Sequence, residues 1–253
     1  MIAVIEHEKN QYKVDLNAPI DLSIPLGDVK CFSAPDVKIE PYTNGEFVGA
    51  VKQGAPVNFF NVALNPHGNG THTECMGHIT KEQESVNKSL KTFHFIATLI
   101  STQVKTDAAS NQIITLDEIK KQCVGKLTEA LIIRTLPNDD SKLTMDYSEK
   151  NPPYLSDKAM QYIVRNNVKH LLIDLPSVDK EVDDGLLIGH HTFWGLDKNS
   201  IKKQDRTKCT ITELIYVDTS IKDGIYFLNL QIAPLELDAS PSKPVIYRLK
   251  KME

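Results

Sequence analysis

Three of the eight histidines in this 253-residue chain fall within the twelve residues 67–78. They are His67, His72 and His78, and Glu74 lies among them in a segment interrupted by three glycines. Imidazole nitrogens and carboxylate oxygens are preferred ligands of divalent zinc, manganese and iron. In an extended segment His72 and Glu74 leave the same face, because they are two residues apart, and glycines let the backbone curl so that His67 and His78 reach that face. We therefore expect a metal site here and not a set of core-packing histidines.

A cation held by these side chains would supply hydrolytic chemistry. With about three protein ligands and one open position, a divalent ion binds a water molecule and lowers its pKa from about 15.7 towards about 7. One carboxylate can also bridge two ions, which together clamp a substrate oxygen. We expect one or two ions per chain, with Zn²⁺ as the first choice and Mn²⁺ as the alternative. His7, His94 and His170, which stand apart from the cluster, are expected to be packing or surface residues.

A second histidine pair, His190-His191, and the acidic residue Glu213 could complete the site. If residues 185–194 form a strand, adjacent side chains point to opposite faces, so at most one of the two histidines reaches a site built elsewhere. Glu213 lies in a strand-like run, where a carboxylate is either on the solvent face or a buried ligand. The residue pattern leaves both possibilities open.

Most of the elements that must position these residues are predicted to be strands. Segments rich in β-branched and aromatic residues predict strands over 20–24, 57–64, 93–100, 130–135, 170–173, 210–217 and 225–230. Residues 115–123 and 156–166 are predicted to be helices, since each segment begins with a hydroxyl residue suited to the N-cap. The polar stretch 136–153 is expected to be a long surface loop and not a domain boundary. The pattern favours a strand-heavy mixed α/β fold in a single domain, residues 1–253.

The composition excludes several kinds of partner. There are 29 Lys and Arg against 33 Asp and Glu, and no basic block, so we expect no nucleic-acid partner and no anionic membrane surface. The longest apolar runs are far shorter than the ~20 residues that span a bilayer. Four scattered cysteines without a CxxC pair favour a reduced compartment. Charge appears at Glu6, before an apolar leader could form, so a cytoplasmic location is expected.

The chain resembles the putative cyclase / kynurenine formamidase (arylformamidase) family of metal-dependent hydrolases, whose motif is H-x-G-T-H-x-D-x-P-x-H. Residues 70–78, Gly-Thr-His-Thr-Glu-Cys-Met-Gly-His, are similar to this motif. Further similarity is found in the order the family has it. Residues 21–26 resemble its D-L-S-x-P-L segment, residues 131–135 its L-I-R-T strand, and residues 173–179 its I-D-x-P-S-x-D segment.

The resemblance implies a site with two metal ions. His67 and His72 would bind the first ion, Glu74 would bridge both, and His190, favoured over His191, would bind the second with Glu213. The same resemblance makes His78 the general acid/base and not a ligand. It also implies a swivelling β/β/α fold, a small-molecule substrate, and assembly as a homodimer or homotetramer.

The sequence departs from the family pattern at four places. His67 stands three residues before Gly70 instead of two, so it needs a one-residue bulge to reach the metal. Glu74 replaces the aspartate of the motif, and Met76 replaces its proline. His190 and Glu213 are 23 residues apart, more than the family pattern implies, and the polar insert 197–209 accounts for the surplus.

The implied reaction is hydrolysis of a small amide, either an N-formyl aryl amine such as N-formylkynurenine or a cyclic amide or imide. Phe59, Phe60 and Trp194 are candidates for an aromatic pocket, with core packing as the alternative, and alternation along a strand would bury one of the two phenylalanines.

Three other interpretations stay open at the level of sequence. His72-x-Glu74 with a distant histidine is also the two-histidine, one-carboxylate arrangement of non-haem iron oxygenases, although Arg206 is too far from His190 to hold an oxo-acid in the usual way. A non-catalytic metal-binding homologue is the second. A nucleophilic Cys75 is the third, although an extended segment would point this thiol away from Glu74.

Overall fold

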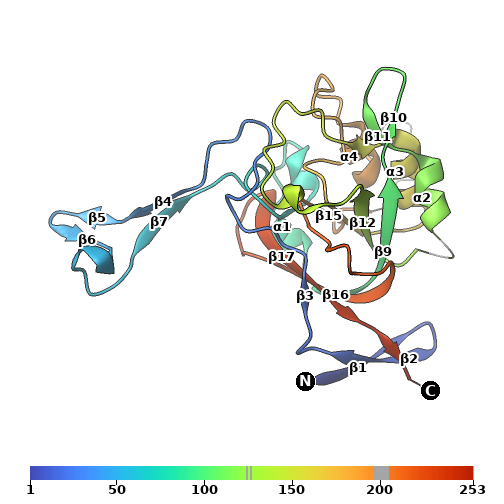
Figure 1. Ribbon diagram of the computed structural model, residues 1–253, viewed down its shortest axis with the longest axis horizontal. Coiled ribbons are helices and arrows are strands. Elements are labelled where there is room, and N and C mark those ends of the chain that lie inside the picture. Colours follow the sequence, from blue (N-terminus) through green and yellow to red (C-terminus); the bar gives the residue numbers. More distant parts are fainter. Residues whose placement is uncertain (124, 126, 197–204, 253) are drawn as a thin grey trace.

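The computed structural model describes residues 1–253 except 124, 126, 197–204 and 253. Its main sheet contains β3 (Ile20–Asp21), β8 (His72–Glu74), β9 (His94–Gln103), β12 (Ala130–Leu136), β14 (His170–Ile173), β15 (Thr210–Glu213), β16 (Gly224–Ile232) and β17 (Ala239–Arg248). The strand order is β16-β9-β12-β14-β15-β8-β17-β3, and β16 also pairs with β17. That extra pairing closes seven of the strands into a barrel, and β3 pairs with β17 further along than β8 does, at Val245 and Ile246 (Figure 1).

The barrel combines parallel and antiparallel strands. Strands β9, β12, β14 and β15 run parallel, with Ile133 of β12 paired to Ile100 on one side and to Ile173 on the other. Strands β8, β17 and β16 close the ring through antiparallel pairs. The two central parallel strands, β12 and β14, are almost continuous apolar runs, as expected for strands that are buried on both faces.

Alternate residues of these strands pack into two different hydrophobic cores. Ala130, Ile132 and Leu172 face the barrel interior together with residues of β9 and β16. Leu131 and Ile133 face outward and pack against the helices. This period of two is the geometry of a strand, and it explains why one short run of apolar residues can serve both cores.

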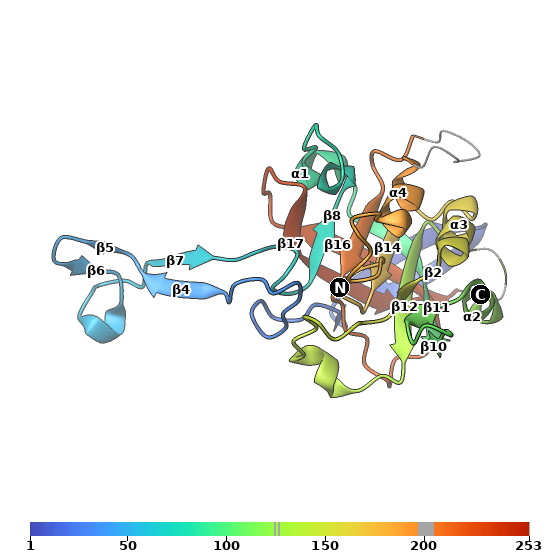
Figure 2. The same ribbon diagram turned by 90° about the horizontal axis from the view of Figure 1, so that it is seen from above.

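Among the described residues, four α-helices accompany the barrel: α1 (Val86–Ser89), α2 (Leu116–Gln122), α3 (Asp157–Arg165) and α4 (Ile188–Trp194). The two predicted helices are α2 and α3. Thr115 and Ser156 are their N-caps, and each side chain accepts a hydrogen bond from a backbone N–H in the first turn. Helix α3 contacts both α2 and α4, and the three helices lie on the same side of the barrel (Figure 2). The prediction of a strand-heavy mixed α/β domain is confirmed.

A long arm, residues 38–63, extends away from the barrel in both views (Figures 1 and 2). It contains β4 (Lys38–Pro41) paired with β7 (Phe60–Ala63), the short pair β5 (Thr43–Asn44) and β6 (Phe47–Val48), and a 3-10 turn η1 (Val51–Gln53). Phe59 is 56% exposed and Phe60 43% exposed. The expectation that one of them is buried is therefore wrong, because the barrel does not cover the arm.

Two small sheets and two 3-10 turns complete the described elements. One sheet joins β1 (Ile2–His7), β2 (Asn10–Asp15) and β18 (Lys250–Lys251), and the other joins β10 (Lys105–Thr106), β11 (Gln112–Ile114) and β13 (Tyr154–Leu155). The turns are η2 (Met76–His78) and η3 (Asp140–Leu143), the second within the predicted loop 136–153.

Two sequence predictions meet limits at this level. The strand predicted over 210–217 ends at Glu213, because Leu214 turns to a left-handed conformation at φ 54°. Most of the polar insert predicted at 197–209 lies outside the described residues. Among the residues described, no helix is both long and apolar enough to cross a bilayer.

Candidate metal centre

Strand β8 carries the first two candidate ligands. It lies between β15 and β17, with His72 directly opposite Glu213 of β15. Opposed residues on antiparallel strands point to the same face, so His72, Glu74 and Glu213 share one face of the sheet. Thr73 points to the other face, where its hydroxyl lies 2.8 Å from that of Thr212. Glu213 is 3% exposed, so this carboxylate lies in the interior and not on a solvent face.

A turn before β8 brings His67 to the same place. Asn65 Oδ1 accepts hydrogen bonds from the backbone N–H of His67 at 3.0 Å and of Gly68 at 3.2 Å. A Cβ at Gly68 would lie 2.3 Å from the Cβ of Ala34, so this close approach requires glycine. The extra residue between His67 and Gly70 is thus absorbed by a hydrogen-bonded turn, and the expected one-residue bulge in a strand is not needed.

His190 reaches the site from helix α4, so the opposite-face argument, which holds for a strand, does not decide between His190 and His191. Asp179 explains the helix, because its carboxylate accepts hydrogen bonds from the first-turn N–H groups of Gly189 at 2.6 Å and His190 at 3.0 Å. A Cβ at Gly189 would lie 2.8 Å from Asp179 Oδ1, so glycine admits the carboxylate. His190 is 2% exposed, whereas His191 is only half-buried and lies about 100° away around the helix.

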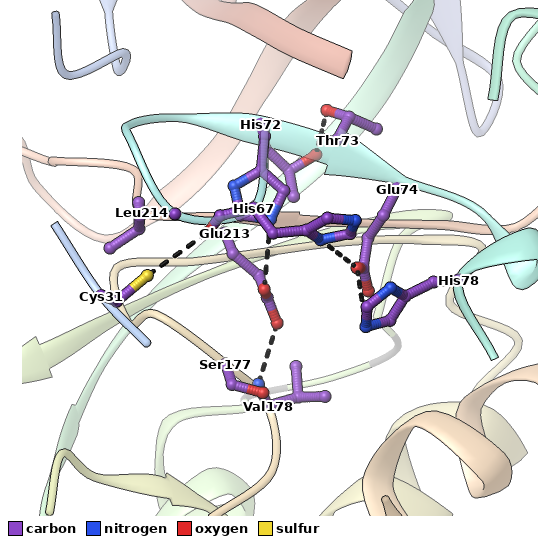
Figure 3. Close-up of polar contacts among 12 residues, drawn as sticks. Cys31, His67, His72, Thr73, Glu74, His78, Ser177, Val178, Glu213 and Leu214 are labelled. Atoms are coloured by element: carbon purple, nitrogen blue, oxygen red, sulfur yellow. Dashed lines mark hydrogen bonds and ion pairs between the residues drawn. The ribbon is translucent and has the colours of Figure 1, made fainter. Parts of the chain in front are cut away.

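The five predicted ligands converge in one series of contacts, and Figure 3 shows four of them, His67, His72, Glu74 and Glu213. Glu74 lies at its centre, with Oε1 3.1 Å from His190 Nε2 and Oε2 3.3 Å from His67 Nδ1. Glu213 closes the series, with Oε2 3.4 Å from His72 Nε2 and Oε1 3.9 Å from His190 Nε2. Four separate segments of the chain, the turn before β8, β8 itself, α4 and β15, therefore meet at one point.

Charge interactions outweigh burial in setting the protonation of this cluster. Burial alone would raise the pKa of Glu74, but the adjacent His190 and His78 hold it well below its usual range. Burial likewise opposes charge on His190, yet Glu74 and Asp179 raise its pKa well above the usual value. The pKa of His67 is raised to about 10 by Asp238 and Glu74, against the effect of burial. The carboxylates of the cluster therefore favour positive charge on the histidines beside them, and the same negative charge would stabilise a bound cation.

Two buried atoms at the centre of the site support a cation. Among the described residues, neither His72 Nε2 nor Glu74 Oε2 has a hydrogen-bond partner. A buried polar atom left in this state costs about 1–3 kcal/mol. Both atoms are of the kinds that bind divalent metals, and a cation near them would satisfy both. The residues therefore fit a metal centre, while the identity of the ion and the division of ligands between two ions stay predictions.

Glu74 belongs to two possible ligand groups. The ligand atoms of His72, Glu74 and Glu213 lie within 4.8 Å of one another, and so do those of His67, Glu74 and His78. A carboxylate shared by two groups is the arrangement expected of a bridging ligand. The second group contains His78, which the family resemblance makes the acid/base, and its Nε2 is 3.8 Å from Glu74 Oε2.

Asp238 is a site residue that the sequence did not indicate. It immediately precedes β17, and its Oδ2 accepts hydrogen bonds from His67 Nε2 at 2.7 Å and His78 Nδ1 at 3.3 Å. The side chains of His67, His78 and Asp238 are 23%, 29% and 31% exposed, so the site opens to solvent on their side. Asp179, though part of the quoted motif, was likewise not predicted to be a site residue.

Two other sequence candidates lie apart from the reacting centre. Cys75 is fully buried, and its thiol donates to the backbone carbonyl of Glu84 at 3.1 Å. Burial raises the pKa of this thiol, which opposes the nucleophilic role considered for it. Trp194 packs its ring 5.6 Å from that of His190, and its indole N–H donates to the carbonyl of Cys209. Trp194 is 2% exposed and so supports His190 from within the core.

Comparison with known proteins matches this geometry to one family model and to several solved structures. The model of the putative cyclase family matches residues 20–180. A predicted metal-dependent hydrolase from Bacillus stearothermophilus aligns with a TM-score of 0.61 at 15% identity, over 91% of this chain and 98% of its own. Isatin hydrolase A from Labrenzia aggregata aligns with a TM-score of 0.62 at 10% identity, over 93% and 94%. Isatin hydrolase A from Ralstonia solanacearum gives 0.60 at 13% identity, over 92% of each chain. No curated protein matches the sequence, and at these identities the solved structures establish the fold.

Proposed function

This chain belongs to the putative cyclase family, and from that premise we propose that it is a metal-dependent hydrolase of a small amide. The observation that carries the proposal is that two buried ligand atoms, His72 Nε2 and Glu74 Oε2, make no hydrogen bond to any described residue although three further candidate ligands surround them. Core packing gives no reason to bury two such atoms together, whereas a metal centre requires them. Structural neighbours named as metal-dependent hydrolases and isatin hydrolases support the same reaction class.

Each part of the site has a role in this reaction. A bound divalent ion supplies a Lewis acid and a water molecule of lowered pKa. His67, His72, Glu74, Glu213 and His190 would hold the ion or ions, the last four from the buried side, where water is excluded and electrostatic interactions are strong. His78 stands on the open side with Nε2 directed at Glu74 Oε2, where it takes up a proton and passes it to the leaving nitrogen.

The substrates we propose are an N-formyl aryl amine, such as N-formylkynurenine, or a cyclic amide or imide. Support comes from the family resemblance and from solved neighbours that are isatin hydrolases, one of them bound to the product analogue thioisatinate. The open side, formed by His67, His78 and Asp238, is the side from which a small planar amide would enter.

The experiment joins metal analysis to a substrate panel. Protein purified without chelator is assayed for bound metal, then stripped and reloaded with Zn²⁺, Mn²⁺ or Fe²⁺, and tested on N-formylkynurenine, isatin and a linear alkyl amide. We expect one or two equivalents per chain and metal-dependent hydrolysis of an aryl or cyclic amide. Oxygen consumption with Fe²⁺ and a 2-oxo acid would instead favour the oxygenase. Stoichiometric metal without turnover would favour a binding protein, and absence of bound metal would overturn the proposal.

We further propose that the chain assembles as a homodimer or homotetramer through the arm, residues 38–63. An isolated two-stranded ribbon is at best marginally stable in water. This one exposes a set of large apolar side chains: Ile39, Val57, Phe59, Phe60 and Val62. Since two-fold symmetry is the commonest closed arrangement, a second copy would cover both arms at once.

Light scattering should give a dimer or tetramer for the wild type and a smaller species for Phe59→Ser/Val62→Ser, with Val182→Ser as the matched exposed control. A monomeric wild type would contradict this.

A further inference from the structure

Two histidine rings lie side by side between two carboxylates on the open side of the site. The centroids of the His67 and His78 rings are 4.2 Å apart, and the planes are tilted by 31°. Each ring presents one nitrogen to Glu74 Oε2, at 3.3 Å from His67 Nδ1 and 3.8 Å from His78 Nε2. Each presents its other nitrogen to a single atom, Asp238 Oδ2, at 2.7 Å and 3.3 Å.

The other site histidines show what an outer acceptor does. His72 Nδ1 lies 3.0 Å from the carbonyl oxygen of Gly70, and His190 Nδ1 lies 2.6 Å from Asp179 Oδ2. An acceptor on one ring nitrogen places the N–H there and leaves the lone pair of the other nitrogen facing the site. His72 and His190 each have an acceptor of their own. His67 and His78 share one.

Backbone hydrogen bonds fix the position of Asp238 relative to the segment that carries His78. Its backbone carbonyl accepts a hydrogen bond from the N–H of Cys75 at 2.9 Å, and that of Leu237 accepts from Val86 at 2.8 Å. The segment between these two anchors carries His78, so the carboxylate and this ring are fixed to the same piece of backbone. The anchoring uses main-chain atoms only, so a change of the Asp238 side chain leaves it in place.

We propose that Asp238 is a positioning residue that sets the ring orientation and tautomer of both His67 and His78. Through His67 it directs the Nδ1 lone pair towards Glu74 and the metal, and through His78 it directs the Nε2 lone pair towards the reacting centre. One carboxylate thus links metal affinity to proton transfer. This inference rests on the proposed function, in which His67 is a ligand and His78 the acid/base.

The test uses Asp238→Ala, which removes the acceptor, and Asp238→Asn, which keeps an acceptor oxygen but removes the charge. Glu236→Ala is the control, an exposed acidic residue two positions earlier that bonds Asn87 and Lys88. Zn²⁺ affinity is measured by competition with a chromophoric chelator. Long-range ¹H–¹⁵N spectra of the Zn²⁺-loaded protein report which ring nitrogens carry protons, and kcat and KM are measured separately.

For Asp238→Ala we expect Zn²⁺ affinity to fall about 10- to 100-fold, kcat to fall about tenfold with little change in KM, and the single ring tautomer of His78, which is not a ligand, to be lost. For Asp238→Asn we expect losses below about tenfold, and for Glu236→Ala none. Should Asp238→Ala fail to fold, Asp238→Asn decides through its Zn²⁺ affinity, and an affinity equal to that of Glu236→Ala overturns the inference. Unchanged Zn²⁺ affinity or an unchanged His78 tautomer in Asp238→Ala also overturns it. These two readouts need no turnover, so they stand apart from a failure of the hydrolase proposal.

Discussion

The site has two halves that differ in burial and in the elements that hold them. The inner half, His72, His190 and Glu213, is at most 3% exposed and comes from strands β8 and β15 and helix α4. The outer half, His67, His78 and Asp238, is about a quarter exposed and comes from turns and strand ends. Glu74 touches both halves, through Oε1 on one side and Oε2 on the other.

The difference indicates a division of labour. Rigid regular elements fix ligand directions within the small tolerance that metal coordination needs, and their burial keeps water away from the ion. Turns at the surface admit a substrate and exchange protons with solvent. We therefore expect changes in the inner half to alter metal binding first, and changes at His78 to alter turnover first.

The largest effect is expected from Glu74→Gln, which removes the charge that joins the halves. The variant should lose at least one metal equivalent per chain, and kcat/KM should fall by roughly a thousandfold or more, because hydroxide is no longer generated near neutral pH. Elemental analysis and steady-state kinetics measure both quantities. Glu82→Gln makes the same change at an exposed position nearby and should leave both unchanged. If Glu74→Gln keeps the metal content of the wild type, the proposal that Glu74 is a bridging ligand is contradicted.

The next effect belongs to the outer half. His78→Ala should retain its metal and lose kcat by about a hundredfold or more, since positioned proton transfer contributes 10²–10⁴-fold. His94→Ala, an exposed histidine that bonds Asn229, is the control. A loss of metal from His78→Ala would show that His78 is a ligand, in agreement with its place in the group with His67 and Glu74, and the two halves would then share one task.

The shared face of His72 and Glu74 and the strand that carries Glu213 could be predicted from the sequence, because their signals are local. The assignment of His190 and Glu213 to the site came only from the family resemblance. The His72-x-Glu74 spacing places both side chains on one face of any strand, and the strand containing Glu213 is marked by β-branched residues. The capping hydroxyls of Thr115 and Ser156 likewise marked helices α2 and α3. Each of these features is decided by residues within a few positions of one another.

What could not be predicted depends on contacts between distant segments. Helix α4 is capped by Asp179, eleven residues before His190, so no pattern within 188–194 announces it. Strand β17 contains Pro241 and Pro244, which argue against a central strand. Asp238 lies 160 residues from His78 and joins it only because β17 pairs with β8. The exposure of Phe59 and Phe60 in the arm was not predicted. Alternation along a strand indicates that the two side chains point to opposite faces, but it does not indicate whether another part of the protein covers either face.

A third, smaller effect is the pH dependence of the unfolding free energy of the metal-free protein, to which His67 of the outer half contributes. The pKa of His67 is raised to about 10, above its unfolded value near 6.5. The folded state therefore binds the extra proton between these values, and this stabilisation is complete below about pH 6.5 and lost as the pH rises towards 10. From pH 7.5 to 9 the unfolding free energy of chelated protein should fall by up to about 2 kcal/mol.

Urea denaturation of the chelated protein measures this slope, and His67→Gln should reduce it; the slope that remains comes from His190, whose pKa is also raised. His170 provides an internal contrast: it is also buried, but burial lowers its pKa to about 3, so its effect on stability falls between about pH 3 and 6.5. A slope that is unchanged in His67→Gln would assign the effect to other groups.

The smallest effect is expected at Asp179, which is not a candidate ligand but hydrogen-bonds the candidate ligand His190. This carboxylate bonds His190 Nδ1 and the first turn of α4, so it orients the inner histidine as Asp238 is proposed to orient the outer pair. Asp179→Asn keeps one acceptor oxygen, and Zn²⁺ affinity should fall only about tenfold, with kcat at saturating Zn²⁺ little changed because His78 is untouched. Asp184→Asn makes the same substitution at an exposed position of the same loop and should have no effect. The contrary outcome is that Asp179→Asn lowers kcat at saturating Zn²⁺ as strongly as His78→Ala does. In that case the orientation of the His190 ring also governs proton transfer, and the division between a metal-binding inner half and a reacting outer half does not hold.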